Sequence, residues 1–330
     1  AAGGTIMIRT LANLLSPAGK NGRLSILIFH RVVARRDEVF DGNPDAIAFA
    51  QRMRWLRTWF HVLPLDEAVQ RLRERCLPAR AAAVSFDDGY ADNYHVALPI
   101  LQQLGVPATF FVATGYLDGG RMWNDTVIES VRRCGQATLD LSGIGLGTHD
   151  LGSPAAMRRT ITVVLDGLKY RPPGERSQAA EHVAQVAGCR LPTDLMMTSE
   201  QVRAMRRAGM LIGAHTATHP ILARLGPDEA RREVVASRDF LQDLLQERVG
   251  LFAYPNGRPS MDYRAEDAEC IRSLGFDAAV TTAWGVADAG SDLMQLPRFT
   301  PWDGTRLRFG LRLLRNLLDD SRRASMQLAG

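Results

Sequence analysis

The chain has 330 residues, of which 46% are hydrophobic, enough to bury the core of one large domain or two small ones. Its formal net charge is +4 and the sequence pI is about 9.1. This charge is too small to indicate nucleic-acid binding, and the aromatic residues, 7% of the chain, form no motif interleaved with basic residues. Composition therefore predicts a folded protein without a nucleic-acid partner.

The four cysteines do not indicate a disulfide framework or a metal knuckle. Cys76, Cys134, Cys189 and Cys270 lie far apart, without the paired spacing that such sites need, so we expect small unpaired thiols. No apolar run is long enough to span a bilayer, and the start of the chain lacks the basic-then-apolar pattern of a signal peptide. With Met7 as the expected natural start, these features favour the cytoplasm or a peripheral position at the inner membrane.

From residue 24 onward, short apolar runs alternate with stretches of helical character. This alternation predicts an α/β fold with a mainly parallel sheet and helices outside it. Residues 1–23 are expected to form an N-terminal extension to a main domain at 24–302. The predicted strands are 24–29, 82–86, 108–112, 210–214, 250–254, 276–280 and 295–300, and the predicted helices are 45–60, 65–75, 92–104, 198–208, 227–247 and 262–274.

Residues 119–193 break the alternation and are expected to form a helical and loop insertion beside the mouth of the barrel. Gly143, Gly145 and Gly147 indicate a loop, and the run Arg-Pro-Pro-Gly from residue 171 indicates a hard turn. The segment Trp123-Asn124-Asp125 opens the insertion. It is expected either to contact substrate or to cap a helix.

The C-terminal segment 303–330 is expected to be an amphipathic helix. Four leucines fall on one face at helical spacing and three arginines fall on another. One interpretation is that residues 304–328 contact an anionic membrane surface or a partner. The other is that the leucines pack on the barrel. The residues are Leu307, Leu311, Leu314 and Leu318, and Arg308, Arg312 and Arg315.

Two motifs carry the chemistry. His215 and His219 stand four residues apart, a spacing that can aim both imidazoles at one point on a single helical turn. The adjacent Asp87 and Asp88 follow a predicted strand, so one carboxylate can bind a metal while the other faces an attacking water. Three protein ligands with an open fourth position are typical of a catalytic zinc rather than a structural one. The pattern predicts a metal hydrolase.

The candidate residues share one position in the predicted fold. His30, Asp87, Asp88, His215 and the turn at 254–257 each come just after a predicted strand. In barrels of alternating strands and helices, active sites lie at the carboxyl ends of the strands. We therefore expect these residues to meet at one edge of the sheet.

The motifs resemble those of polysaccharide deacetylases with the NodB homology domain, carbohydrate esterase family 4. The run Ser-Phe-Asp-Asp-Gly ending at residue 89 is similar to the first motif of that family, and His-Thr-Ala-Thr-His at 215–219 matches the second. The resemblance covers about residues 24–302. It implies a distorted (β/α) barrel, with Asp88, His215 and His219 on a divalent metal and Asp87 as catalytic base.

The third motif of the family, Arg-x-Pro-Tyr, falls on Ala253-Tyr254-Pro255-Asn256, so the arginine that holds the base in the family is missing here. Arg298 is our candidate replacement and Arg258 the second choice. Asn256 occupies the position whose backbone amide faces the oxyanion, and Tyr254 is a candidate for substrate contact. Trp284 corresponds to the tryptophan of the fourth motif, which lines the sugar site or packs beneath it.

The family's last motif, Leu-x-x-His, which carries the catalytic acid, is absent after Asn256. It occurs instead at Leu27-Ile28-Phe29-His30. This arrangement resembles the circularly permuted branch that includes poly-N-acetylglucosamine deacetylases of exopolysaccharides. The resemblance implies that His30 protonates the leaving amine. Zn²⁺ is the expected metal, with Co²⁺ or Ni²⁺ as alternatives.

Two alternative functions remain open at this stage. The same chemistry could act on peptidoglycan, chitin oligomers, a lipid-linked amino sugar or an O-acetyl ester. The missing arginine of the third motif is compatible with a carbohydrate-binding relative that has lost catalysis, although the complete Asp-Asp and His-x-x-x-His set argues against it.

Overall fold

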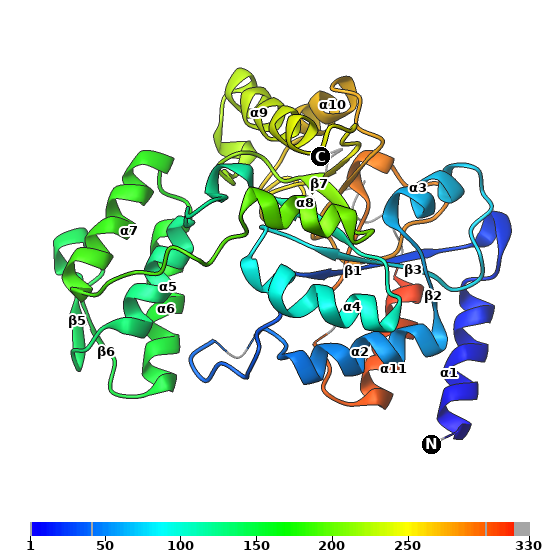
Figure 1. Cartoon of the computed structure of the whole chain (residues 1–330), viewed down its shortest axis with the longest axis horizontal. Helices are drawn as coiled ribbons and strands as arrows, with labels where there is room; N and C mark the ends of the chain where they lie inside the picture. Colours follow the sequence, from blue (N-terminus) through cyan, green and yellow to red (C-terminus); the bar gives the residue numbers. More distant parts are fainter. Residues whose placement is uncertain (1, 41, 301, 320–330) are drawn as a thin grey trace.

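The structure is a computed structural model that describes residues 2–40, 42–300 and 302–319, with only the backbone at residues 2–5. Its main sheet is parallel and runs in the order β1-β3-β4-β7-β8-β9, with the short β2 beside β3 (Figure 1). This confirms the predicted α/β fold. The strands are β1 (Leu24–Phe29), β2 (His61–Val62), β3 (Ala81–Phe86), β4 (Thr109–Val112), β7 (Leu211–Ala214), β8 (Leu251–Ala253) and β9 (Ala278–Val280).

An irregular segment closes the sheet into a distorted barrel. Leu296 forms a parallel bridge with Val280 of β9, and Phe299 forms one with Leu27 of β1. The prediction of a regular strand at 295–300 is wrong, since residues 293–295 form a 3₁₀ turn and only isolated bridges follow. Pro297 lies between the two bridges and has no amide hydrogen, so a continuous ladder cannot form across it.

The two faces of the sheet carry different side chains because successive residues of a strand point to opposite sides. The face toward the helices carries large residues, such as Phe29, Phe86 and Phe252. The inner face carries many small ones, including Ala81 and Ala83 of β3. Residues of β3 alternate between the two faces, so Ser85 and then Asp87 lie on the inner side. The alternation therefore places the Asp87 carboxylate in the barrel interior.

Six helices surround the barrel close to their predicted positions. Asp45 caps the first of them by accepting a hydrogen bond from the amide of Ala48, and Thr198 and Gln201 form a capping box at another. The predicted helix at 92–104 begins with a π-helical turn at 93–97. The helices are α2 (Ala46–Trp59), α3 (Leu65–Arg73), α4 (Leu98–Leu104), α8 (Ser199–Arg207), α9 (Pro227–Leu245) and α10 (Ala265–Ser273).

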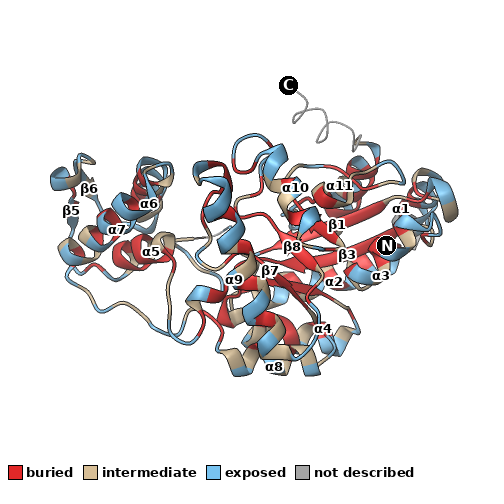
Figure 2. Ribbon diagram, turned by 90° about the horizontal axis from the view of Figure 1, so that it is seen from above, coloured by how far each residue is buried: buried red, intermediate tan, exposed pale blue. Residues whose placement is uncertain are grey.

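Residues 123–187, between β4 and β7, form a separate helical unit beside the barrel (Figures 1 and 2). It has its own core, in which Val127, Ile161 and Val183 are buried. Arg224 lies over the ring of Tyr170, and this contact joins the unit to the loop after β7. Its elements are α5 (Trp123–Arg133), the hairpin of β5 (Thr138–Asp140) and β6 (Thr148–Asp150), α6 (Pro154–Lys169) and α7 (Pro173–Ala187).

The two ends of the described chain pack together. Helix α1 (Ala2–Leu15) contacts α11 (Arg306–Leu318) where Ile8 meets Gly310. Ile8 and Ala12 belong to the main core, so the segment predicted as an extension is part of the barrel's packing. Among the described helices, none combines the length and apolar character needed to cross a bilayer.

The prediction for the apolar face of α11 needs a correction. Leu314 is buried together with Phe309, Leu313 and Leu317, whereas Leu307, Leu311 and Leu318 are exposed. The helix therefore has one apolar face in the core and a second row of leucines in water. Residues 320–330 of the predicted segment lie outside the described part of the chain.

Candidate metal centre and active site

Three side chains converge at the carboxyl edge of the sheet. The Nε2 atoms of His215 and His219 each lie 3.4 Å from Oδ1 of Asp88. All three atoms are within 4.8 Å of one another. For ligands about 2.0–2.1 Å from a tetrahedral ion, neighbouring ligand atoms are about 3.3–3.4 Å apart. The spacing of these atoms thus fits a single divalent metal.

The tautomer of His215 also suits a metal ligand. Its Nδ1 lies 2.7 Å from the carbonyl oxygen of Ala253, an acceptor, so Nδ1 carries the proton. Nε2, which faces Asp88 and His219, is then the nitrogen left to bind a metal. Metal-binding histidines commonly have this second contact, which fixes the orientation of the ring.

The two histidines do not share a helical turn, and that prediction is wrong. They lie in an irregular loop after β7, in which Thr216 and His219 have left-handed backbone conformations, with φ of 63° and 53°. Asp88 also has a positive φ, 79°. Such values are unusual for residues with side chains and persist where the surrounding structure enforces them.

Glu233 of α9 holds the histidine loop in place, and sequence analysis missed it. Its carboxylate accepts hydrogen bonds from the amides of Ala217 and Thr218, at 3.0 and 2.8 Å. It also accepts one from the Thr218 hydroxyl at 2.7 Å. Tyr116 donates to the Thr218 carbonyl from the other side, at 2.8 Å. The only signal in the sequence is an acid on a helix, which local spacing cannot connect to the loop.

Asp87, next to Asp88 in the chain, faces the interior of the barrel, and the charge of His215 is among the influences on its pKa. Both its oxygens accept hydrogen bonds from the guanidinium of Arg298, each at 2.7 Å. Arg298 has no exposed surface and also donates to the Thr281 carbonyl and the Ser85 hydroxyl, at 2.8 and 3.1 Å. A bidentate pair fixes the carboxylate in direction as well as position. Arg258, the second-choice arginine, pairs with Asp262 instead.

The two carboxylates are held in their ionised forms. Burial raises the pKa of Asp87, but the Arg298 charge and its hydrogen bonds outweigh burial and bring the pKa below its usual value. Burial also raises the pKa of Asp88, and the contacts with His215 and His219 more than offset it. Burial lowers the pKa of His219 to about 4, so this ring is neutral at physiological pH, as a metal ligand must be.

His30 and Asn256 lie on the same edge of the barrel. The side chain of His30 is exposed, and its charge is among the causes that lower the pKa of both Asp87 and Asp88. Its backbone carbonyl accepts a hydrogen bond from Asn93 at 2.9 Å. Asn256 has a φ of 59°, and among the described residues its amide meets no acceptor.

The two aromatic candidates differ. Trp284 is 47% exposed and its ring centroid lies 5.0 Å from that of Trp302, which is also exposed. Tyr254 is fully buried, stacks on Tyr263 with centroids 3.9 Å apart, and donates to the Met294 carbonyl. Because its ring has no free surface, Tyr254 is a core residue, and the prediction that it contacts substrate is wrong.

A buried polar cluster lies beside the aspartate motif. Arg31 pairs with Asp92 at 2.6 Å and its guanidinium lies 4.6 Å from the centre of the Tyr90 ring. The Tyr90 hydroxyl donates to Asp125 of α5 at 3.0 Å. Asp125 is thus neither a helix cap nor exposed, and the helix begins after Met122. The insertion reaches the residues next to His30 and Asp88 through this contact.

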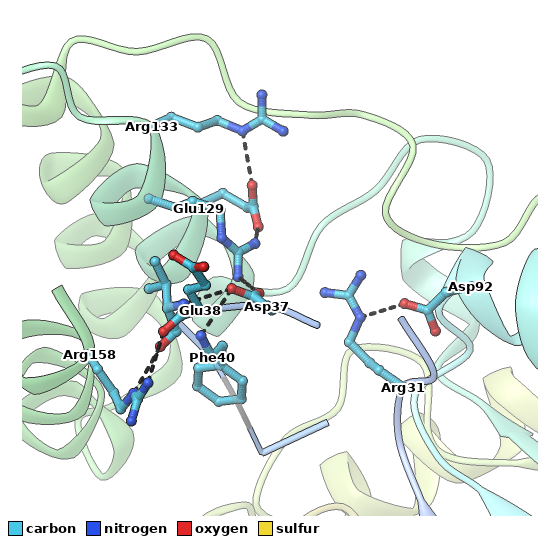
Figure 3. Close-up of polar contacts among 10 residues, drawn as sticks. Arg31, Asp37, Glu38, Phe40, Asp92, Glu129, Arg133 and Arg158 are labelled. Atoms are coloured by element: carbon cyan, nitrogen blue, oxygen red, sulfur yellow. Dashed lines mark hydrogen bonds and ion pairs between the residues drawn. The ribbon is translucent and has the colours of Figure 1, made fainter. Parts of the chain in front are cut away.

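The loop between β1 and α2 also docks on the insertion. Figure 3 shows Asp37, Glu38 and Phe40 lying against the helices that carry Glu129 and Arg158. Arg158 donates to the carbonyl of Glu38 at 2.8 Å, and Arg132 pairs with Asp37. The loop begins at His30, and the insertion braces it at residues 37–39.

Fold and site together define a class: an α/β-barrel protein with an Asp-His-His cluster suited to a divalent metal. A family model described as polysaccharide deacetylase matches residues 74–149 and 172–279, more than half of the chain. The protein belongs to the polysaccharide deacetylase family.

Known relatives agree with this assignment. The chain is 22% identical over 284 residues to the Bacillus subtilis protein YxkH, whose name places it among the polysaccharide deacetylases, covering 84% of this chain and 71% of that protein. A Streptococcus pyogenes deacetylase, PplD, in complex with acetate matches with a TM-score of 0.60 at 21% identity, over 88% of this chain and 98% of that one. IcaB from Ammonifex degensii matches with a TM-score of 0.59 at 19% identity, over 91% and 98%. The two structures support the fold.

Proposed function

We propose that the protein is a zinc-dependent hydrolase that removes N-acetyl groups from an exopolysaccharide containing N-acetylglucosamine. One observation carries the proposal: Asp87, ionised and held by Arg298, stands next to Asp88, which faces His215 and His219. A fixed base adjacent to a metal cluster is what hydrolysis of an unreactive amide needs. Membership of the polysaccharide deacetylase family supports the acetyl group as the target.

Asp88, His215 and His219 would hold the metal. Two imidazoles and a carboxylate with an open fourth position suit Zn²⁺, and Co²⁺ and Ni²⁺ accept similar ligands. When bound, the metal would lower the pKa of a water molecule and polarise the acetyl carbonyl. His219 is already neutral at physiological pH, so it can bind the ion without first losing a proton.

The chain's own residues divide the proton transfers. Asp87 takes a proton from the attacking water, and Arg298 keeps the carboxylate aimed at it. The backbone amide of Asn256 donates to the oxyanion that forms at the carbonyl oxygen. His30 gives a proton to the leaving amine of the sugar. Acetate and a glucosamine unit are the products.

Trp284 and Trp302 form an exposed aromatic pair for the sugar ring. Their ring centroids are 5.0 Å apart, and about half of each side chain is free. Trp284 follows β9, whose carboxyl end lies on the same edge as the metal cluster. Apolar faces of sugar rings pack on such surfaces, so this pair is our candidate for the subsite that holds the polymer.

The test is acetate release from N-acetylglucosamine oligomers, together with metal analysis. Asp88→Ala should lose both metal and activity because it removes one of three ligands. Asp87→Asn should keep the metal while turnover falls about 10²-fold or more, as expected when a general base is lost. The exposed Asp66→Asn, on α3, is the matched control.

Full activity in Asp87→Asn would disprove the assigned base. A wild-type protein that binds metal but releases no acetate from any substrate would instead be a carbohydrate-binding relative without catalysis. A panel of peptidoglycan fragments, chitin oligomers, lipid-linked N-acetylglucosamine and O-acetylated sugars separates the remaining alternatives by relative kcat/KM.

A further inference from the structure

The exposed apolar side chains of the described chain are concentrated on α1 and α11. Of the fourteen large hydrophobic residues that are exposed, seven lie on these two helices. They are Ile6, Met7, Leu11, Leu14, Leu307, Leu311 and Leu318, with 40–72% of each side chain in water. Single exposed hydrophobic residues need no explanation, but a concentration on two packed helices indicates a contact surface.

On each helix these residues form a row. Met7, Leu11 and Leu14 are spaced by four and three residues, so they share one face of α1. Leu307, Leu311 and Leu318 share one face of α11 in the same way. The opposite side of each helix packs in the core, where Ile8 and Ala12 of α1 and Phe309 of α11 are buried. We call the two exposed rows together the α1–α11 surface.

The charged residues within these two helices all have one sign. Neither α1 nor α11 contains an aspartate or a glutamate, whereas α1 carries Arg9 and α11 carries four arginines. Arg308 and Arg315 are exposed and lie three and four residues from Leu311, so they flank the leucine row. Within the described chain, neither of these two arginines makes an ion pair or a side-chain hydrogen bond.

We propose that the α1–α11 surface docks the protein on a lipid bilayer that contains anionic headgroups. The leucine rows would enter the boundary between headgroups and acyl chains, and Arg308 and Arg315 would meet the phosphates. Apolar rows alone would also suit a second copy of the chain. In a twofold dimer, however, the same surface would face itself, and neither helix carries an acidic residue that could pair with the arginines of the other copy. This inference goes beyond the proposed function and does not depend on it.

Two substitution sets in the full-length chain test the proposal by vesicle co-sedimentation. The first replaces the leucines (Leu307→Ser, Leu311→Ser, Leu318→Ser) and the second replaces the arginines (Arg308→Gln, Arg315→Gln). All five side chains are exposed, so the fold should tolerate both sets, unlike removal of α11, which would uncover the core. The matched controls are Val163→Ser, Phe240→Ser and Met261→Ser, and Arg231→Gln with Arg232→Gln, all exposed elsewhere.

The wild-type chain should sediment with phosphatidylcholine vesicles that contain phosphatidylglycerol, and added salt should weaken this binding. The arginine set should lower partitioning about tenfold or more, since each basic residue at such a surface contributes on the order of 1 kcal/mol. The leucine set should abolish binding, while both control sets bind like the wild type. Circular dichroism spectra should be unchanged in every variant.

Equal partitioning of the wild type and both test sets would overturn the proposal, as would a wild type that does not bind these vesicles. Light scattering of the same samples distinguishes the main competitor. If the wild type is a dimer, the leucine set is monomeric and neither binds vesicles, the surface joins two copies of the chain.

Discussion

The candidate site has a buried half and an exposed half, and the fold holds them in different ways. The buried half is almost fully shielded from solvent, and each of its polar groups has a fixed partner. It comprises Asp87, Asp88, Arg298 and His215. The exposed half consists of His30, Trp284 and Trp302, which lie on loops after the strands. Burial in the core therefore holds the proposed base and most of the proposed metal ligands in place, whereas exposed loops position the proposed acid and substrate contacts.

This difference has a physical reason. A buried carboxylate must be paired, because an uncompensated charge in the core costs several kcal/mol. The same pairing that keeps Asp87 stable also aims it. An exposed imidazole has no such requirement, so its position depends on how well the surrounding loops are braced. The insertion supplies that bracing through Arg158 and through the contact of Asp125 with Tyr90.

The largest effect is expected from Arg298→Leu. Asp87 would remain buried without its partner, so the free energy of unfolding should fall by about 3–5 kcal/mol in chemical denaturation. The control is Arg206→Leu, whose pair with Glu247 is about one-third exposed and should contribute under about 1 kcal/mol. Adding Asp87→Leu to Arg298→Leu should restore much of the loss. Similar losses of unfolding free energy in Arg298→Leu and Arg206→Leu would contradict the greater cost expected for breaking the buried pair.

His30→Ala should show the opposite behaviour. Because the side chain is exposed, stability and metal content should hardly change, while kcat falls about 10²–10⁴-fold if His30 is the acid. His61→Ala is the control, since His61 is also exposed but lies at the start of the sheet, opposite Ala81. Steady-state kinetics and metal analysis give both readouts. A His30→Ala enzyme as fast as His61→Ala would exclude this role.

Glu233→Ala tests whether the histidine loop needs its tether. Three hydrogen bonds to the loop would be lost, so Zn²⁺ affinity should fall about 10–100-fold, measured by competition with a chelator. Glu229→Ala, exposed on the same helix, should bind Zn²⁺ like the wild type. Unchanged affinity in Glu233→Ala would show that the left-handed residues of the loop hold the site without it.

The smallest effect concerns Asp125, which links the insertion to the site. Burial raises its pKa from 3.8 to about 7. The folded state then keeps a proton that the unfolded state releases, so the stability this group contributes is full below about pH 4 and declines toward pH 7. In metal-free protein, the free energy of unfolding of Asp125→Asn should rise by about 1–2 kcal/mol relative to that of the wild type as the pH increases from 5 to 7. A difference that stays constant with pH, as expected for Asp66→Asn, would argue against a protonated Asp125.

The sequence alone located most of the fold and most residues of the candidate site. Strands bounded by turn residues and buried on both faces appear as short apolar runs, and six of the seven predicted ones are strands. The predicted strand at 295–300 is not one, because Pro297 has no amide hydrogen for a continuous ladder and only isolated bridges form on either side of it. Asp87, Asp88, His215 and His219 could be found because parallel strands end at a common edge, which brings the residues after them together.

The tertiary structure decided which groups pair and which faces are covered. Arg298 lies 211 residues from Asp87 in the sequence, where it is the first of two candidates with Arg258, and only the fold decides that it is the one that pairs with Asp87. Periodicity places Leu307, Leu311 and Leu314 on neighbouring positions of one helix, but only packing buries Leu314 and leaves the other two in water. Local sequence determines the shape and polarity of an element, whereas its contacts depend on where the rest of the chain folds around it.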